Sequence, residues 1–77
     1  MNLTILTPER DIFNCEVNLV QLPGSDGLFE ILKNHAPMIA SLKKGKIKVE
    51  NNNDLQYFEI NGGVVEVLNN RVLVLAD

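Results

Sequence analysis

Residues 46–60, which read KIKVENNNDLQYFEI, decide the fold class of this chain. Residues 46–50 alternate strictly between charged and aliphatic side chains, as a β-strand with one solvent-exposed face does. Residues 56–60 place their large apolar side chains on one face in the same way. The polar residues 51–54 lie between the two segments and predict a longer hairpin loop, because asparagine and aspartate favour turns. The stretch therefore predicts two antiparallel strands.

The same pattern continues toward both ends of the chain. Strand-like segments are separated by turn signals that recur roughly every 8–12 residues, the spacing of an all-β sandwich or barrel. Asn69-Asn70 is one of these signals, and further turns or kinks are expected at Pro23-Gly24-Ser25-Asp26-Gly27, Lys43-Lys44-Gly45 and Gly62-Gly63. No segment has the sustained 3.6-residue apolar period of a helix. We therefore expect a single all-β domain that spans residues 1–77.

Two segments depart from simple alternation. Val17 and Leu19 have one parity whereas Val20 and Leu22 have the other, which predicts a bulge or bend in mid-strand. Residues 72–76 are apolar on both faces. Such a strand is expected to be covered on both sides, and the core can supply one cover and a partner protein the other.

The composition argues against several classes of protein. The net charge of -3 disfavours a nucleic-acid-binding protein, because phosphate recognition normally needs a basic face. The single cysteine, Cys15, allows no internal disulfide, which suits a reducing compartment such as the cytoplasm. The N-terminus lacks the features of a secretory signal, and no apolar run approaches the roughly 20 residues that cross a bilayer. We expect membrane association only through a partner.

His35, the only histidine, is the candidate for catalysis or metal binding. Its spacing from Asp26 and Glu30 matches no ligand motif that we recognise. Ser25, His35 and Asp26 make a triad on paper, but the sequence has no nucleophile elbow and nothing that brings the three together. We therefore predict no catalytic residue, no cofactor and no metal site. His35 is interpreted as a hydrogen-bonding residue of a turn or as a partner contact.

The segment after His35 is more apolar than a small core requires. Pro37 restricts Ala36 to an extended conformation, and Met38 and Ile39 follow. This segment is interpreted either as a core strand or as a docking edge in which Met38 is an adaptable contact. The lysines nearby predict a solvated strand face, and they are Lys43, Lys44, Lys46 and Lys48.

Six short motifs occur in order along the chain. They are Leu6-Thr7-Pro8-Glu9-Arg10 with Phe13, Leu22-Pro23-Gly24-Ser25-Asp26-Gly27, Ile31-Leu32 with His35-Ala36-Pro37-Met38, Leu42 with Gly45, Gly62-Gly63-Val64-Val65-Glu66-Val67, and Val74-Leu75-Ala76-Asp77. Each motif is weak alone, but six in this order over 77 residues are specific. Through them the sequence resembles, nearly from end to end, the N-terminal β domain of the ATP synthase epsilon subunit.

The resemblance implies a flattened β-sandwich of about ten short strands. It implies a non-catalytic rotor-stalk subunit that binds the gamma subunit along one side and touches the polar loops of the c-ring. Such a subunit couples ATP synthesis to proton or sodium transport from the cytoplasmic face of the bacterial inner membrane, as a peripheral protein. The residues expected to bind partners are Leu28, Phe29, Glu30 and Ile31, in the loop that matches the c-ring contact, and His35, Met38 and Ile39.

The chain also departs from the pattern of that family. Leu28 stands where the family often has an acid, Glu30 where it usually has glycine, and Lys33-Asn34 where it has Pro-Gly. The sequence stops at Asp77, where typical members continue into a helical hairpin. That hairpin carries self-inhibition of ATP hydrolysis and, in some members, ATP binding. We expect both functions to be absent here if the chain is the whole native subunit.

Two other interpretations stay open at this point. A stand-alone β domain that binds sugar or nucleic acid requires a concave site rich in aromatic or basic groups, and the chain has only four aromatic residues. A small hydrolase or metal enzyme requires His35 to converge with acids in a pocket. The position of these side chains in space discriminates among the three interpretations.

Overall fold

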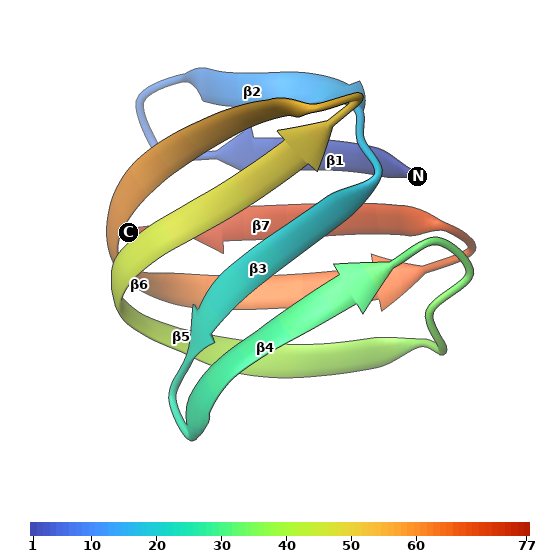
Figure 1. Cartoon of the computed structure of the whole chain (residues 1–77). Helices are drawn as coiled ribbons and strands as arrows, with labels where there is room; N and C mark the ends of the chain where they lie inside the picture. Colours follow the sequence, from blue (N-terminus) through green and yellow to red (C-terminus); the bar gives the residue numbers. More distant parts are fainter.

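The computed structural model describes residues 1–77 and consists of seven β-strands (Figure 1). The strands are β1 Asn2–Leu6, β2 Asp11–Glu16, β3 Leu19–Gly24, β4 Gly27–Leu32, β5 Met38–Asn51, β6 Asp54–Leu68 and β7 Arg71–Ala76. They form one sheet in the order β2-β1-β7-β6-β5-β3-β4. Neighbouring strands are antiparallel except β1 and β7, which are parallel. The structure contains no helix long and apolar enough to cross a membrane.

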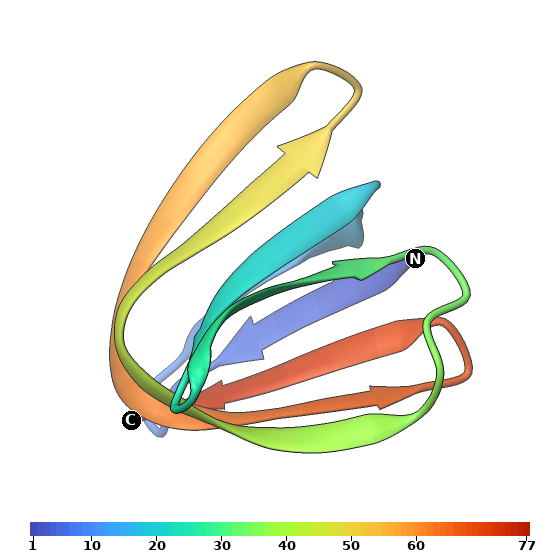
Figure 2. The same cartoon turned by 60° about the horizontal axis from the view of Figure 1, so that its bottom comes forward.

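The sheet folds over on itself because its two longest strands bend together (Figure 2). β5 and β6 stay paired from end to end, and the pairing of β6 with β7 begins at Gly63, so Gly62 and Gly63 lie where β6 enters the second half of the sheet. Gly62 and Gly63 have backbone φ angles of 140° and 145°, a conformation that L-residues with a side chain rarely adopt. These glycines therefore let one continuous pair of strands belong to two packed layers.

Each layer takes half of both long strands. We call one the β7 layer, and it contains β2, β1, β7, residues 62–68 of β6 and residues 38–43 of β5. We call the other the β3 layer, and it contains β3, β4, residues 45–51 of β5 and residues 54–60 of β6. The predicted all-β sandwich is confirmed. The predicted count of about ten strands is too high, because β5 and β6 each serve both layers as one uninterrupted strand.

Sixteen buried apolar side chains fill the space between the layers. They follow the period of two that a strand imposes, so Ile47 and Val49 point inward in β5, as their alternation with lysine predicts. In β7, Val72 and Val74 are buried, whereas Leu75 is 49% exposed. In the chain alone the core covers one side of this strand and the other side is open. The cover of the outer side by a partner protein stays a prediction.

The change of parity after Val17 has a simpler cause than a bulge. β2 ends at Glu16 and β3 begins at Leu19, so Val17 and Asn18 connect two separate strands. The Val17 N–H donates to the carbonyl oxygen of Met1 (2.8 Å), which holds this connection against the N-terminus. Of the predicted bulge or bend, the structure has a bend at Asn18, and it lies in a two-residue connection and not in the middle of a strand.

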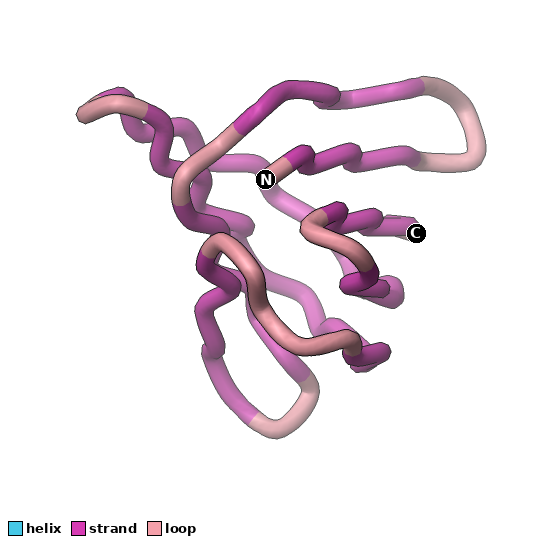
Figure 3. Tube along the Cα trace, turned by 90° about the vertical axis from the view of Figure 1, so that its right-hand side faces the viewer, coloured by secondary structure: helices cyan, strands magenta, loops and turns pink.

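Asparagine supplies every positive φ angle outside glycine. The five residues have φ angles between 50° and 73°, and they are Asn34, Asn52, Asn53, Asn69 and Asn70. Two pairs of them form the two-residue turns between β5 and β6 and between β6 and β7, a geometry that needs positive φ at both central positions. Residues 51–54 thus form a tight turn and not the longer loop that was predicted. Figure 3 views the molecule from the end where these turns lie.

The Asn70 side chain also ties two connections together, because its Oδ1 accepts a hydrogen bond from the Asn34 N–H (3.0 Å). We expect Asn70→Ala to destabilise the domain by about 1–2 kcal/mol, since alanine loses this bond and is strained at positive φ. Asn70→Gly tolerates the φ angle and loses only the bond, so its effect should be smaller. Urea unfolding measures the free energy of unfolding of both variants. An equal decrease in the two would show that the positive φ angle of residue 70 does not contribute to the effect of alanine.

Candidate partner-docking surface

The predicted partner-binding residues come from β4 and from the start of β5. Three of them, Phe29, Met38 and Ile39, line one hollow of about 290 Å³ between these two strands. The β3–β4 turn closes one end of the hollow, where the Ser25 N–H donates to the carbonyl oxygen of Ser41 (3.0 Å). Phe29 and Met38 pack against the core, whereas Ile39 is 72% exposed. The fold thus brings two segments of the predicted site to one flank of the sandwich.

The remaining predicted residues of β4 divide between surface and core. Leu28 is 67% exposed, and Glu30 is exposed and accepts a hydrogen bond from Nε2 of Gln21 (3.3 Å). Ile31 is completely buried opposite Val20 of β3. Its side chain therefore belongs to the core and cannot contact a partner while the domain is folded. Alternation along β4 decides this division, because neighbouring residues of a strand face opposite sides.

His35 lies in the connection between β4 and β5, where its backbone N–H donates to the carbonyl oxygen of Leu32 (3.2 Å). Its Nδ1 lies 2.7 Å from the carbonyl oxygen of Ala36, so Nδ1 carries a proton in this contact. Ser25 lies at the opposite end of the six-residue strand β4, and its Oγ bonds to Oγ of Ser41 (2.8 Å). The structure therefore does not assemble the triad written from the sequence. No group of three or more His, Cys, Asp or Glu side chains is placed to hold a metal ion.

The outer side of the β7 layer carries a group of apolar side chains, of which only Ile39 was predicted to bind a partner. We call this surface the outer apolar face, and its residues are Leu6, Ile39, Val64, Leu68, Leu73 and Leu75. Val64 lies opposite Leu75, which lies opposite Leu6 on the parallel strand β1. Ile39, Val64, Leu68 and Leu75 are between 42% and 72% exposed. Leu6, Leu75 and Val64 thus adjoin one another across three neighbouring strands, and Glu66 lies among the other members of the face.

One sequence signal for this surface was available. Residues 72–76 are apolar on both faces, and a strand with a solvated outer side would alternate with polar residues. Leu73 and Leu75 are the outward members of that run. The position of Val64 and Leu68 beside them could not be predicted, because the pairing of β6 with β7 in that register is a tertiary property.

The outer side of the β3 layer has a different character. Lys46 pairs with Glu59, and Lys48 lies between Gln21 and Tyr57. Exposed apolar residues on this side, such as Leu55 opposite Glu50, have charged neighbours. The two outer sides of the sandwich therefore differ in arrangement, because only on the β7 layer do apolar residues lie directly opposite one another across three strands.

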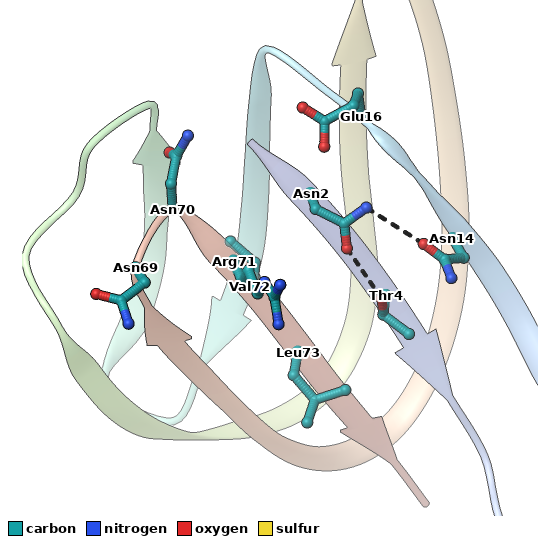
Figure 4. Close-up of a pocket in the computed structure, with 9 residues that line it drawn as sticks. All are labelled: Asn2, Thr4, Asn14, Glu16, Asn69, Asn70, Arg71, Val72 and Leu73. Atoms are coloured by element: carbon teal, nitrogen blue, oxygen red, sulfur yellow. Dashed lines mark hydrogen bonds between the residues drawn. The ribbon is translucent and has the colours of Figure 1, made fainter.

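A shallow polar hollow of about 640 Å³ adjoins the outer apolar face (Figure 4). Its lining residues are Asn2, Thr4, Asn14, Glu16, Asn69, Asn70, Arg71, Val72 and Leu73. Within it the Asn2 Nδ2 donates to Asn14 Oδ1 (3.3 Å), and the Thr4 hydroxyl donates to Asn2 Oδ1 (3.3 Å). Amides of this kind can donate and accept hydrogen bonds at the polar rim of a protein interface.

The sequence has clear relatives. All residues, 1–77, match the family model described as ATP synthase, Delta/Epsilon chain, beta-sandwich domain. The ATP synthase epsilon chain of Leptospira borgpetersenii is 36% identical over 77 residues, which are 100% of this chain and 61% of the relative. The ATP synthase epsilon chain of Chlorobium limicola is 42% identical over 76 residues, covering 97% of this chain and 86% of the relative. The chain thus spans between about three fifths and nine tenths of these relatives.

A solved structure shares the fold. A chain in the central stalk and c-ring structure of the mitochondrial ATP synthase of Tetrahymena thermophila superposes with a TM-score of 0.84 at 18% identity. The match covers 97% of this chain and 61% of that chain. At this identity the likeness concerns the fold alone.

Proposed function

Because this chain belongs to the family of the ATP synthase delta/epsilon chain β-sandwich domain, we propose that it is a rotor-stalk subunit of an F-type ATP synthase. The proposed subunit is non-catalytic, docks the gamma subunit to the c-ring, and so couples ATP synthesis to proton or sodium transport. The observation that carries this proposal is the outer apolar face, because a small domain rarely exposes a cluster of adjoining apolar side chains that it does not use.

The two sides of the domain suit different partners. The outer apolar face, with Ile39 at its margin, fits a large and lasting protein interface, which is the role proposed for the gamma subunit. Leu28 and Glu30 project from the other layer, near charged and polar neighbours, which fits the polar loops proposed for the c-ring. His35 and Met38 lie on the chain between these two regions. Phe29 supports the hollow from the core side.

The proposed location is the cytoplasmic face of a bacterial inner membrane, peripheral and held there by the complex. Relatives in Leptospira borgpetersenii and Chlorobium limicola are epsilon chains of bacterial ATP synthases. The alternative of a stand-alone ligand-binding domain gains no support from the polar hollow, since its lining consists mainly of amide, charged and aliphatic side chains and includes no aromatic ring.

The direct test is binding of the chain to purified gamma subunit from the same source. We expect a one-to-one complex by co-elution from a sizing column, with the affinity measured by calorimetry. Ile39→Asp should weaken binding by roughly tenfold or more, because a carboxylate would have to be desolvated at the apolar margin. Leu55→Asp, an equally polar change at an exposed apolar residue of the other layer, should leave the affinity unchanged. No complex with the unmodified chain would reject the proposed function.

A further inference from the structure

Glu66 is a carboxylate surrounded by the side chains of the outer apolar face. Along β6 it lies between Val64 and Leu68, the neighbours that share its side of the strand. Across the sheet it pairs with Ile39 of β5 and Leu73 of β7. All four of these neighbours are apolar, and Glu66 itself is exposed. A charge at the centre of an apolar surface needs an explanation, because interface cores are normally depleted of charge.

No cation of the chain pairs with Glu66. The only ion pair in the structure joins the Met1 amino group to Oε1 of Glu16 (3.7 Å). Arg71 lines a hollow of about 500 Å³ together with Glu66, but it makes no ion pair with it. In the register of the sheet Arg71 lies opposite Leu68 and Asn2, two pairs further along, so it is the diagonal neighbour of Glu66 on the same face. Water therefore solvates the Glu66 carboxylate in the free domain.

This arrangement changes when a partner covers the face. The four apolar neighbours would be buried together with Glu66, and the carboxylate would lose its water. A carboxylate buried without a partner is strongly unfavourable, whereas a positively charged, hydrogen-bonding group offsets the loss of hydration. A cation that the partner brings to the position opposite Glu66 offsets this cost directly.

We propose that the outer apolar face recognises an apolar protein surface that carries one cationic side chain, arginine or lysine, opposite Glu66. The inference rests on the proposed function, which makes the gamma subunit the owner of that surface. The apolar residues supply the contact area, and the single ion pair fixes the register of docking. Partners with a neutral or acidic group at that position are rejected, since they would leave Glu66 buried and unpaired.

The test compares two charge-neutralising variants on one strand. Glu66→Gln keeps the shape of the side chain and removes its charge. Glu59→Gln makes the same change on β6 in the other layer, where Glu59 lies opposite Lys46. Each variant is titrated with purified gamma subunit by calorimetry at about 50 mM and about 300 mM salt, because salt screens charge pairs. We expect Glu66→Gln to weaken binding roughly tenfold or more at low salt and to reduce the salt dependence. Glu59→Gln should bind like the unmodified chain.

Three results would overturn the inference while the proposed function stands. The first is an affinity of Glu66→Gln equal to or tighter than that of the unmodified chain. The second is a weaker affinity with an unchanged salt dependence, which would indicate a neutral hydrogen bond. The third is an equal loss in Glu59→Gln. If the unmodified chain does not bind gamma, or if this face instead joins two copies of the chain into a dimer on a sizing column, both proposals are rejected.

Discussion

Gly63→Ala is expected to unfold the domain at room temperature. A Cβ atom at this position would lie 2.2 Å from the carbonyl oxygen of Leu75 and 2.9 Å from Cα of Ala76. These are backbone atoms of the neighbouring strand β7, so they can move away only if the pairing of β6 with β7 breaks. The φ angle of 145° adds conformational strain, which costs about 1–3 kcal/mol for a residue with a side chain. Together we expect a loss of about 4 kcal/mol or more, near the whole stability of a small domain.

Gly27→Ala is the matched control for this prediction. Gly27 also has a positive φ angle, 131°, but no atom lies within 4 Å of the position that a Cβ would occupy. This variant therefore measures strain without a clash, and we expect it to lose only about 1–3 kcal/mol. Circular dichroism and urea unfolding report both variants. A folded Gly63→Ala protein as stable as Gly27→Ala would show that the layers do not depend on the close approach at Gly63.

Leu75→Asp is expected to abolish most of the affinity for the gamma subunit without unfolding the chain. Leu75 lies between Val64 and Leu6 in the middle of the outer apolar face and is 49% exposed in the free domain. An aspartate there stays solvated in the free domain but becomes a buried, unpaired carboxylate in the complex. We expect a loss of roughly 100-fold or more, about 2.7 kcal/mol, as for a central residue of an interface.

Two further measurements make this result specific. Leu75→Met keeps the apolar contact and nearly the same volume, so its affinity for gamma should stay within a few-fold of that of the unmodified chain. Thermal unfolding of Leu75→Asp should lie close to that of the unmodified chain, because the side chain points away from the core. Undiminished binding of a folded Leu75→Asp protein would show that gamma docks on another surface. The surface of the β3 layer near Leu28 and Glu30 would then be the next to test.

The amino-acid sequence predicted the local features of this protein well. The alternation of residues 46–50 correctly placed Ile47 and Val49 inside, because a strand turns successive side chains to opposite faces whatever surrounds it. The turn at Asn69 and Asn70 was also predictable, since asparagine tolerates positive φ as an intrinsic property. The ordered motifs correctly predicted the family. The strand alternation and the turn depend on residues that are close together in the chain, whereas the family is indicated by motifs along its whole length.

The layers and the docking surface depended on contacts between distant residues. Lys43-Lys44-Gly45 and Gly62-Gly63 gave signals of turns or kinks, but they lie inside β5 and β6, and nothing local states that each strand passes from one layer to the other. The count of about ten strands came from the family resemblance. Ile31 was placed in the predicted partner site, yet its strand partner Val20 draws it into the core. Val64 and Leu75 make one surface only because β6 and β7 pair in a single register.

The sequence by itself therefore determined that the chain forms strands and where most of its turns lie, because strand period and turn conformation are set by near neighbours. Its ordered motifs also determined the family. Only the tertiary structure decided which apolar residues are core and which form the outer apolar face around Glu66. Burial depends on which strands lie opposite one another, and that is a property of the folded sheet as a whole.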